Sequence, residues 1–426
     1  QNIMLTWQDQ KSKSYRSFDK EKMTGLMKKL DGQKAVVEEI KKTPKKTYAP
    51  LLYDLTELQR EANQRFGYSA KETLNIMQRL YENHKVLTYP RTDSRYLSKD
   101  IVPTIKDRLE ACGTGPYRKL AMTAKKKDLS GKLAFVNDAK VSDHHAIIPT
   151  EQFVDLSHMT NEERKIYDLV VRRFLAVLYP PFEYEQTQVT VKVGDETFLA
   201  SGKIVKAQGW RAAYEEEVYL AEDEEEEEAY ESGKSLKGQT LPELEKGQEI
   251  KGLVLSLTEG KTKPPAHFNE ATLLSAMENP TAYMESHDKA MAKTLGETGG
   301  LGTVATRADI IEKLFKSFLL EKRGKDIYLT SKAKQLLELV PEELKQPELT
   351  ADWEMRLSQI AKGKLSRKDF MKDIDKYTDQ VVYEIKAGAG TFRHDNLTNS
   401  KCPRCGKRML AVKGKNSEML VCQDRE

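Results

Sequence analysis

A short polar segment in the first quarter of the chain reads Thr88-Tyr89-Pro90-Arg91-Thr92-Asp93-Ser94. A tyrosine has an ordinary pKa near about 10, so it becomes a nucleophile only where positive charge or a base favours the phenolate. Arg91 lies two positions after Tyr89 and would point to the same side of a strand, where its planar fork suits a phosphate. The segment indicates either a tyrosine that attacks a phosphate ester or a polar turn with a surface ion pair, and its spacing alone favours the turn.

The residues before this segment carry helix signals. Asp54-x-x-Glu57 and Ser69-x-x-Glu72 have the form of capping boxes, and apolar residues follow the second box at helical spacing. Two helices are therefore predicted between residues 54 and 83. Residues 86–89 read as a short strand, because the proline that follows cannot continue a ladder or a helix. This predicts that Tyr89 lies at a strand end, facing a cleft.

A second polar cluster lies between residues 142 and 150 and contains two of the seven histidines, His144 and His145. A histidine beside Asp143 can donate to a phosphate or shuttle a proton near neutral pH. Adjacent residues of a strand point to opposite sides, so at most one of the two histidines is expected to act. If the Tyr89 segment is left out of account, a structural role is the better interpretation of these histidines.

Length and charge bound the class of protein. A chain of 426 residues exceeds one core and predicts several domains. Its 70 Lys and Arg balance 66 acidic residues, but ten of those acids lie within residues 215–228, a predicted exposed loop, so the remainder is basic. A basic remainder suits a polyanionic partner, although scattered lysines also serve simply as solvating charges. With neither a signal peptide nor a membrane span in the sequence, the protein is expected to be cytoplasmic.

The remaining pattern alternates between strand-rich and helical parts. Strands are predicted at 3–7 and 34–40, a helix at 160–178, and further strands between 184 and 260. From residue 268 onward the pattern is mostly helical. A helix with an apolar face at 310–318, a hairpin at 319–329 and another helix from Thr330 together predict a winged-helix-like unit.

Five motifs together resemble those of type IA DNA topoisomerases, the first of them made of two segments, and their residues look most like the bacterial topoisomerase III branch. They occur in the order in which that family has them, so chance is a poor explanation although each alone is weak. The segments are residues 64–69, 78–82, 88–94, 143–150, 263–273 and 300–307.

The resemblance implies an isomerase that cuts one DNA strand and reseals it without ATP. Tyr89 would form a 5′-phosphotyrosyl link, Arg91 would neutralise the scissile phosphate, and His144 would support the site. The ligand would be mainly single-stranded DNA, bound by a monomer associated with the nucleoid. Backbone amides of the glycine-rich loop at 299–302 are also expected to hold a phosphate. The DNA-binding candidates are Arg91, Asp93, Ser94, His144, Thr306 and Arg307.

The fold class implied by the resemblance is a multidomain α+β protein, an arch with winged-helix-like helical domains and a strand-rich hinge domain. The hinge domain is expected in two parts, on either side of the tyrosine-bearing domain. The expected boundaries are 1–50 for the first hinge part, 51–172 for the tyrosine-bearing catalytic domain, 173–260 for the second hinge part, 261–392 for the helical DNA-binding domain and 398–426 for the start of a zinc ribbon.

One departure from the family concerns its metal. Type IA enzymes carry a Toprim domain whose acidic residues bind Mg2+, and nothing before Tyr89 has a strand-Asp-x-Asp arrangement. The sequence is therefore expected to be a piece without that domain, one that supplies the nucleophile without the Mg2+ cofactor and is inactive alone.

The last 25 residues raise the question of a second metal. Cys402, Cys405 and Cys422 have the opening of a zinc ribbon, which needs four ligands. His394 is a poor candidate for the fourth, because it lies outside the cysteine hairpin. An incomplete Zn2+ site and unliganded thiols remain open alternatives.

Two rival functions are weighed against the topoisomerase interpretation. A tyrosine nickase or relaxase needs two histidines separated by one residue so that both face a metal, whereas His144 and His145 are adjacent. A non-catalytic winged-helix protein that grips duplex DNA would explain the hairpin at 319–329 but leaves the Tyr89 and His144 segments unexplained.

Overall fold

The computed structural model describes residues 2–214, 236, 238–286, 288–388, 394–413 and 418–424. The acidic run at 215–228, predicted to be an exposed loop, lies outside the described residues. The chain divides into two compact units. The first unit comprises residues 1–53, 84–88 and 94–264, and the second comprises residues 54–83, 89–93 and 265–426.

The first unit combines a sheet with a group of helices. Its elements are β1 (Thr6–Gln8), α1 (Lys20–Leu30), β2 (Ala35–Thr47), α4 (Ile105–Cys112), α5 (Arg118–Ala124), α6 (Asn161–Ala176), β3 (Phe182–Val193), β4 (Glu196–Ala207), β5 (Gly238–Gln239) and β6 (Glu249–Ile250).

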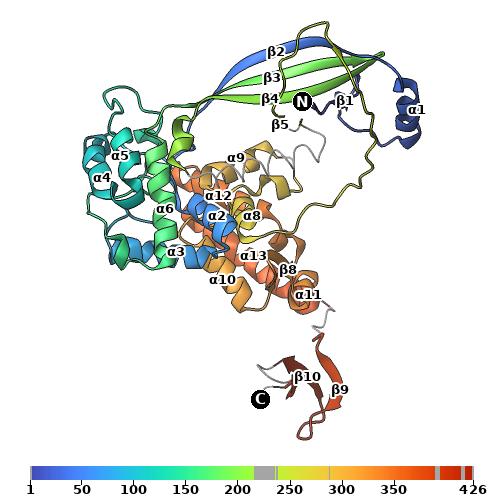
Figure 1. The fold of residues 1–426 in the computed structure, drawn as a ribbon. Coiled ribbons are helices and arrows are strands. Elements are labelled where there is room, and N and C mark those ends of the chain that lie inside the picture. The colour runs from blue at the N-terminus through green and yellow to red at the C-terminus, as the bar shows by residue number, and fades with distance from the viewer. Residues whose placement is uncertain are drawn as a thin grey trace. The chain divides into compact units, whose positions relative to one another are not determined.

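The sheet of the first unit has six strands in the order β1-β4-β3-β2-β6, with β5 pairing in parallel to β4. The long strands β2, β3 and β4 are antiparallel neighbours and run side by side (Figure 1). Along β3, the buried Val189, Val191 and Val193 alternate with more exposed residues, so one face of the sheet packs into a core with Leu30 of α1. The strands predicted at 34–40 and in 184–260 are confirmed, and β2 is longer than predicted.

The strand predicted at 86–89 is wrong, because the structure has only an isolated bridge between Leu87 and Pro149 there. The pairing is partial. Thr88 donates its backbone N–H to the carbonyl of Ile148 at 3.0 Å, and its hydroxyl accepts from the Ile148 N–H at 3.0 Å. The Ile148 N–H bonds to the Thr88 side chain and not to the Thr88 carbonyl, so the ladder does not extend past this bridge.

The second unit is mostly helical. Its elements are α2 (Leu55–Phe66), α3 (Ala70–Glu82), α8 (Glu270–Glu278), α9 (Lys289–Thr298), α10 (Arg307–Lys316), β7 (Leu320–Arg323), β8 (Asp326–Leu329), α11 (Ser331–Leu339), α12 (Pro347–Ala361), α13 (Arg367–Ala387), β9 (Leu397–Lys401), β10 (Arg408–Lys413) and β11 (Glu418–Cys422).

The two helices predicted between 54 and 83 are confirmed, with their caps. Ser69 and Glu72 form a capping box at the start of α3, and the Asp54 side chain accepts from the Glu57 N–H at 2.7 Å at the start of α2. These helices share a core with α8 and α10. Its buried members are Leu55, Ala70, Leu74, Leu274, Ala308 and Ile311.

The predicted succession of helix, hairpin and helix is present as α10, the β7–β8 hairpin and α11. The mixed α+β class is therefore confirmed. The predicted tyrosine-bearing domain at 51–172 contributes residues to both compact units, and the finer domain boundaries stay predictions. Among the described residues, no helix is both long and apolar enough to cross a bilayer.

Candidate active site

Tyr89 lies in irregular backbone directly after the partial bridge, in the second unit, and its side chain is half-buried. Tyr81, from the last turn of α3, packs edge-on against it. The two ring centroids are 5.6 Å apart and the ring planes are 81° apart, a favourable aromatic geometry. Helix α3 therefore fixes how the Tyr89 ring is oriented.

Arg91 is half-buried in the same unit and faces the same helix. One guanidinium nitrogen, Nη2, lies 3.5 Å from Oε1 of Gln78 on α3. The Nε of Arg91 is buried and has no hydrogen-bond partner among the described residues. A buried donor without a partner costs roughly 1–3 kcal/mol, so an acceptor that came within reach of this nitrogen would stabilise the segment.

Asp309 of α10 completes the charged surroundings of Arg91. It forms an ion pair with Lys71 of α3 at 2.6 Å. The hydrogen bond from Lys71, and then the positive charges of Lys71 and Arg91, hold the pKa of Asp309 below its ordinary value. Lys71, Arg91 and Asp309 therefore interact electrostatically within the second unit.

The glycine-rich loop at 299–302 is folded back on α8. Gly300 has a φ of +83°, and a Cβ there would lie 2.2 Å from the carbonyl oxygen of Met277, so only glycine fits. The amide of Gly300 donates to Leu295 and that of Leu301 donates to Met277. The prediction that loop amides hold a DNA phosphate is wrong for these two amides, because their hydrogens are already used.

Arg307 is 2% exposed and holds this loop in place. Its guanidinium group donates to the carbonyl oxygens of Leu301, Gly302 and Gly299, and to the hydroxyl of Thr56 on α2. Burial lowers the pKa of Arg307 below its ordinary value. As folded here, the side chain supports the loop from within and does not reach a ligand at the surface.

The other DNA-binding candidates differ in exposure. Asp93 and Thr306 are exposed, and Thr306 accepts from the Thr303 N–H at 2.9 Å. Ser94, in the first unit, is 3% exposed and donates to the carbonyl oxygen of Lys140 at 2.7 Å. Ser94 and Arg307 are both buried, and burial does not favour direct contact with DNA. Their contact with DNA therefore stays a prediction.

The two histidines have different surroundings within the first unit. His144 is exposed, beside a hollow that Lys99 and Asp100 also line. His145 is half-buried, with its Nδ1 2.7 Å from the carbonyl oxygen of Ala146. Burial lowers the pKa of His145 below its ordinary value. Of the pair, His144 has the exposure that a ligand-binding residue needs.

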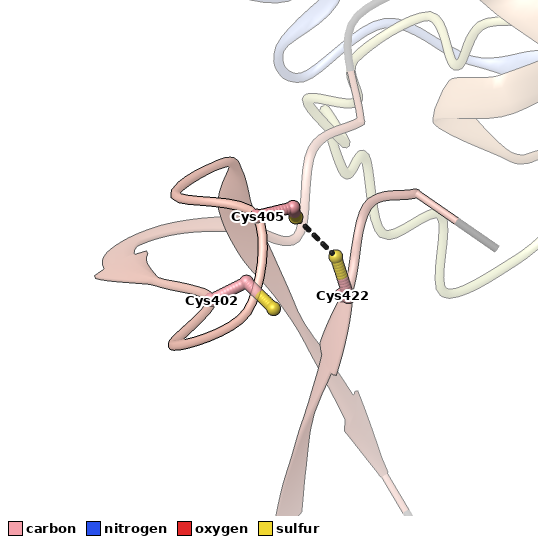
Figure 2. A group of neighbouring side chains, drawn as sticks. All are labelled: Cys402, Cys405 and Cys422. Atoms are coloured by element: carbon pink, nitrogen blue, oxygen red, sulfur yellow. Dashed lines mark hydrogen bonds between the residues drawn. The ribbon is translucent and has the colours of Figure 1, made fainter. Parts of the chain in front are cut away.

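The three cysteines near the carboxyl end converge on one point, as Figure 2 shows. The sulfur atoms of Cys402, Cys405 and Cys422 lie within 4.8 Å of one another, and those of Cys405 and Cys422 are 3.4 Å apart. Backbone amides of Cys405 and Arg404 lower the pKa of Cys402 to about 7, which favours a thiolate. Three converging thiols suit Zn2+, and His394 is not a member of this group.

The sequence interpretation gave no role to Gln78, Tyr81, Lys71 or Asp309. A signal was present for three of them. Lys71, Gln78 and Tyr81 are spaced by seven and three residues on one predicted helix, so they share a face. Asp309 carried no such signal, because its proximity to α3 depends on how α10 packs.

The comparisons with known proteins agree with one another. The family described as DNA topoisomerase matches residues 2–372 of this chain. DNA topoisomerase 3 of Bacillus subtilis (strain 168) is 59% identical over 424 residues, which is 100% of this chain and 57% of that protein. DNA topoisomerase 3 of Bacillus licheniformis is 58% identical, with the same coverage.

The chain belongs to the DNA topoisomerase family. It is a type IA member, similar to bacterial DNA topoisomerase 3, and it spans 57% of the length of these curated relatives. The solved structure of full-length topoisomerase I from Thermotoga maritima has the same fold, with a TM-score of 0.63 and 23% identity. That alignment covers 99% of this chain and 63% of the Thermotoga chain.

One group of described residues could hold a metal ion. Among those residues, the three cysteines are the single group of three or more acidic, histidine or cysteine side chains that converge closely enough to hold an ion. The described part of the chain therefore offers three thiols that would supply most of a zinc site.

Proposed function

We propose that Tyr89 is the nucleophile of a topoisomerase III-like enzyme that acts on single-stranded DNA. Its phenol oxygen forms a bond to phosphorus while the bond from phosphorus to the 3′-oxygen breaks, and the phenol proton ends on that 3′-oxygen. The 5′-phosphate stays linked to Tyr89. After another strand has passed, attack by the 3′-hydroxyl reverses these bond changes, and no ATP is consumed because the phosphotyrosyl link conserves the phosphodiester energy.

The observation that carries this proposal is the orphaned nitrogen of Arg91 in the Tyr89 segment. Its Nε is buried and without a partner among the described residues, and a phosphate oxygen would satisfy it. A guanidinium group that binds the scissile phosphate also stabilises the charge that develops as Tyr89 attacks. The resemblance of residues 88–94 to a motif of the family implies the same pairing of roles.

The remaining candidate residues have supporting roles in this proposal. His144, Asp93 and Thr306 are exposed and would contact DNA, with His144 donating to a phosphate. Ser94 and Arg307 are buried, and they would act on DNA only by shaping the segments that carry them.

We propose further that these 426 residues by themselves cleave and relax DNA poorly. The resemblance to type IA enzymes implies that cleavage uses Mg2+ bound by acidic residues of a Toprim domain, and the residues before Tyr89 have no strand-Asp-x-Asp arrangement of that kind. The complete enzyme would act as a cytoplasmic, nucleoid-associated monomer, with Zn2+ held by Cys402, Cys405 and Cys422.

The test mixes labelled single-stranded DNA and Mg2+ with this chain and a separately supplied Toprim segment, and then separates products under denaturing conditions. A covalent adduct that forms with the wild-type chain and is lost in Tyr89→Phe supports the nucleophile. Tyr96→Phe is the matched control, since it removes the hydroxyl of a neighbouring tyrosine and should leave the adduct unchanged.

Two outcomes would contradict these proposals. An adduct that persists in Tyr89→Phe would remove Tyr89 from the chemistry. Efficient Mg2+-dependent relaxation by the chain without the Toprim segment would refute the requirement for that domain. Reassembled pieces that bind duplex in preference to single strands, with no adduct, would instead favour a winged-helix binding protein built on α10, β7, β8 and α11.

A further inference from the structure

One face of the sheet in the first unit gathers basic, amide and aromatic side chains from three strands. The register pairs Lys41 of β2 with Gln188 of β3, and Lys45 with Tyr184. On the other side of β3, Gln186 pairs with Lys203 of β4. Paired residues of antiparallel strands point to the same face and lie roughly 4.5–5.5 Å apart, so these six side chains form one continuous surface.

This surface is hollowed. It lines a cavity of about 500 Å³, to which Tyr15 and Gly238 also contribute. The cavity lies within the first unit and contains none of the candidate active-site residues. A concave site with several convergent polar groups is the usual form of a binding site.

The lysines on the two faces of this sheet differ in whether they form ion pairs. On the opposite face, Lys46 pairs with Glu183 at 2.7 Å, and Lys206 lies 4.0 Å from Glu185. On the hollowed face, Lys41 and Lys45 are exposed and make no ion pair with a described residue. Lys41 and Lys45 therefore bring to the hollowed face positive charge that no described carboxylate pairs with.

The aromatic content of the hollow restricts the partner. Tyr184 is half-buried, and the ammonium group of Lys203 lies 4.7 Å from its ring centroid. Ammonium groups bind phosphates, glutamine amides pair with base edges, and a tyrosine ring stacks on a base. A duplex keeps its base faces covered, so a tyrosine inside a basic hollow favours an unpaired strand.

We propose that this face, formed by Lys41, Lys45, Tyr184, Gln186, Gln188 and Lys203, binds a segment of single-stranded nucleic acid. The site is separate from Tyr89 and does not depend on the chemistry proposed for that residue. Lysines contact the phosphates, and Tyr184 with the two glutamines contacts the bases. It is a second nucleic-acid surface on the chain.

The first test is lysine footprinting of the complete 426-residue chain. The protein is acetylated briefly with and without an oligothymidylate, and each lysine is quantified by mass spectrometry. We expect several-fold protection of Lys41, Lys45 and Lys203, with Lys46 and Lys206 unchanged. Equal reactivity in both samples, or lysines already shielded in the free protein, would overturn the proposal. So would protection by a duplex or by polyglutamate where oligothymidylate gives none.

The second test uses two charge-matched double variants, each of which loses two positive charges from the same sheet. Lys41→Gln with Lys45→Gln removes two proposed phosphate contacts, whereas Lys46→Gln with Lys206→Gln removes ion-paired lysines of the opposite face. The dependence of log K for oligothymidylate on log salt should become shallower by about 1.4 in the first variant, from about 0.7 per single-strand phosphate. It should stay unchanged in the second.

These tests separate this proposal from that for Tyr89. Tyr89→Phe should abolish the covalent adduct without changing the lysine footprint. Equal salt slopes in the two double variants would attribute the effect to net charge and overturn the assignment of the surface, whatever the adduct assay gives.

Discussion

Tyr81 packs its ring against the edge of Tyr89 at a centroid distance of 5.6 Å, although the two residues lie on different sides of the turn that follows α3. The contact comes from a helix whose start is fixed by the capping box of Ser69 and Glu72. The capping box fixes where α3 begins, and α3 carries the Tyr81 ring that contacts the proposed nucleophile, Tyr89. Loss of the Tyr81 ring would remove this aromatic contact from Tyr89.

Tyr81→Ala should slow adduct formation in the reconstituted cleavage assay by up to about tenfold, since an aromatic pair contributes roughly 0.5–1.5 kcal/mol. Tyr81→Phe is the control, because it keeps the ring. Binding of single-stranded DNA should be similar in both variants. An equal loss of rate in Tyr81→Phe would mean that the hydroxyl, and not the ring contact, matters.

Arg307→Ala should lower the free energy of unfolding by about 2–4 kcal/mol, because it leaves the buried Thr56 hydroxyl and partly buried loop carbonyl oxygens without this donor. Urea denaturation gives the comparison. Arg323→Ala is the control: its side chain is 66% exposed and pairs with Glu321 on the surface, where an ion pair contributes at most about 1 kcal/mol. A stable Arg307→Ala protein that merely binds DNA less tightly would instead favour direct contact by Arg307.

Gly300→Ala should destabilise the second unit more than Gly324→Ala. Both glycines have positive φ, +83° and +64°, so alanine is strained at each by about 1 kcal/mol. At Gly300 the added Cβ also meets backbone oxygens at 2.2 and 2.4 Å, whereas nothing lies within 4 Å at Gly324. Equal urea midpoints for the two variants would show that the loop at 299–302 moves easily.

His145 should make the first unit less stable in acid. Burial lowers the pKa of His145 in the folded state below its ordinary value of 6.5, so the unfolded chain takes up the proton first. Stability from this residue is fully present above the unfolded pKa and is lost as the pH falls below it. In urea titrations between about pH 5 and pH 7.5, His145→Gln should flatten the profile. His158→Gln, at an exposed position, should leave it unchanged.

Cys405→Ser should release zinc from the purified chain, as measured by elemental analysis. Three converging thiols supply most of a tetrahedral site, and losing one leaves two. Cys112→Ala is the control, since Cys112 is buried in the first unit and is not a member of the group. A wild-type chain purified without any bound zinc would support unliganded thiols.

The features that the sequence alone determined are local ones. The capping box of Ser69 and Glu72 was readable because a side chain and the N–H it caps are three residues apart. The hairpin of β7 and β8 was readable from a turn between two short apolar runs. The Tyr89 and His144 segments were readable because the motifs of the family are contiguous.

The tertiary structure decided which of the predicted site residues are accessible to a ligand. It also decided which other residues lie beside them. Arg307 looked like a DNA ligand, but one of its hydrogen-bond partners is Thr56, 251 positions away, and no local pattern reports such a contact. The strand predicted before Tyr89 is reduced to a single bridge, because the Ile148 N–H bonds to the Thr88 hydroxyl in place of the Thr88 carbonyl. Lys41 and Lys46 are chemically identical, and only strand register places one in a hollow and the other beside Glu183. Burial and register are set by long-range packing, which local sequence does not encode by itself.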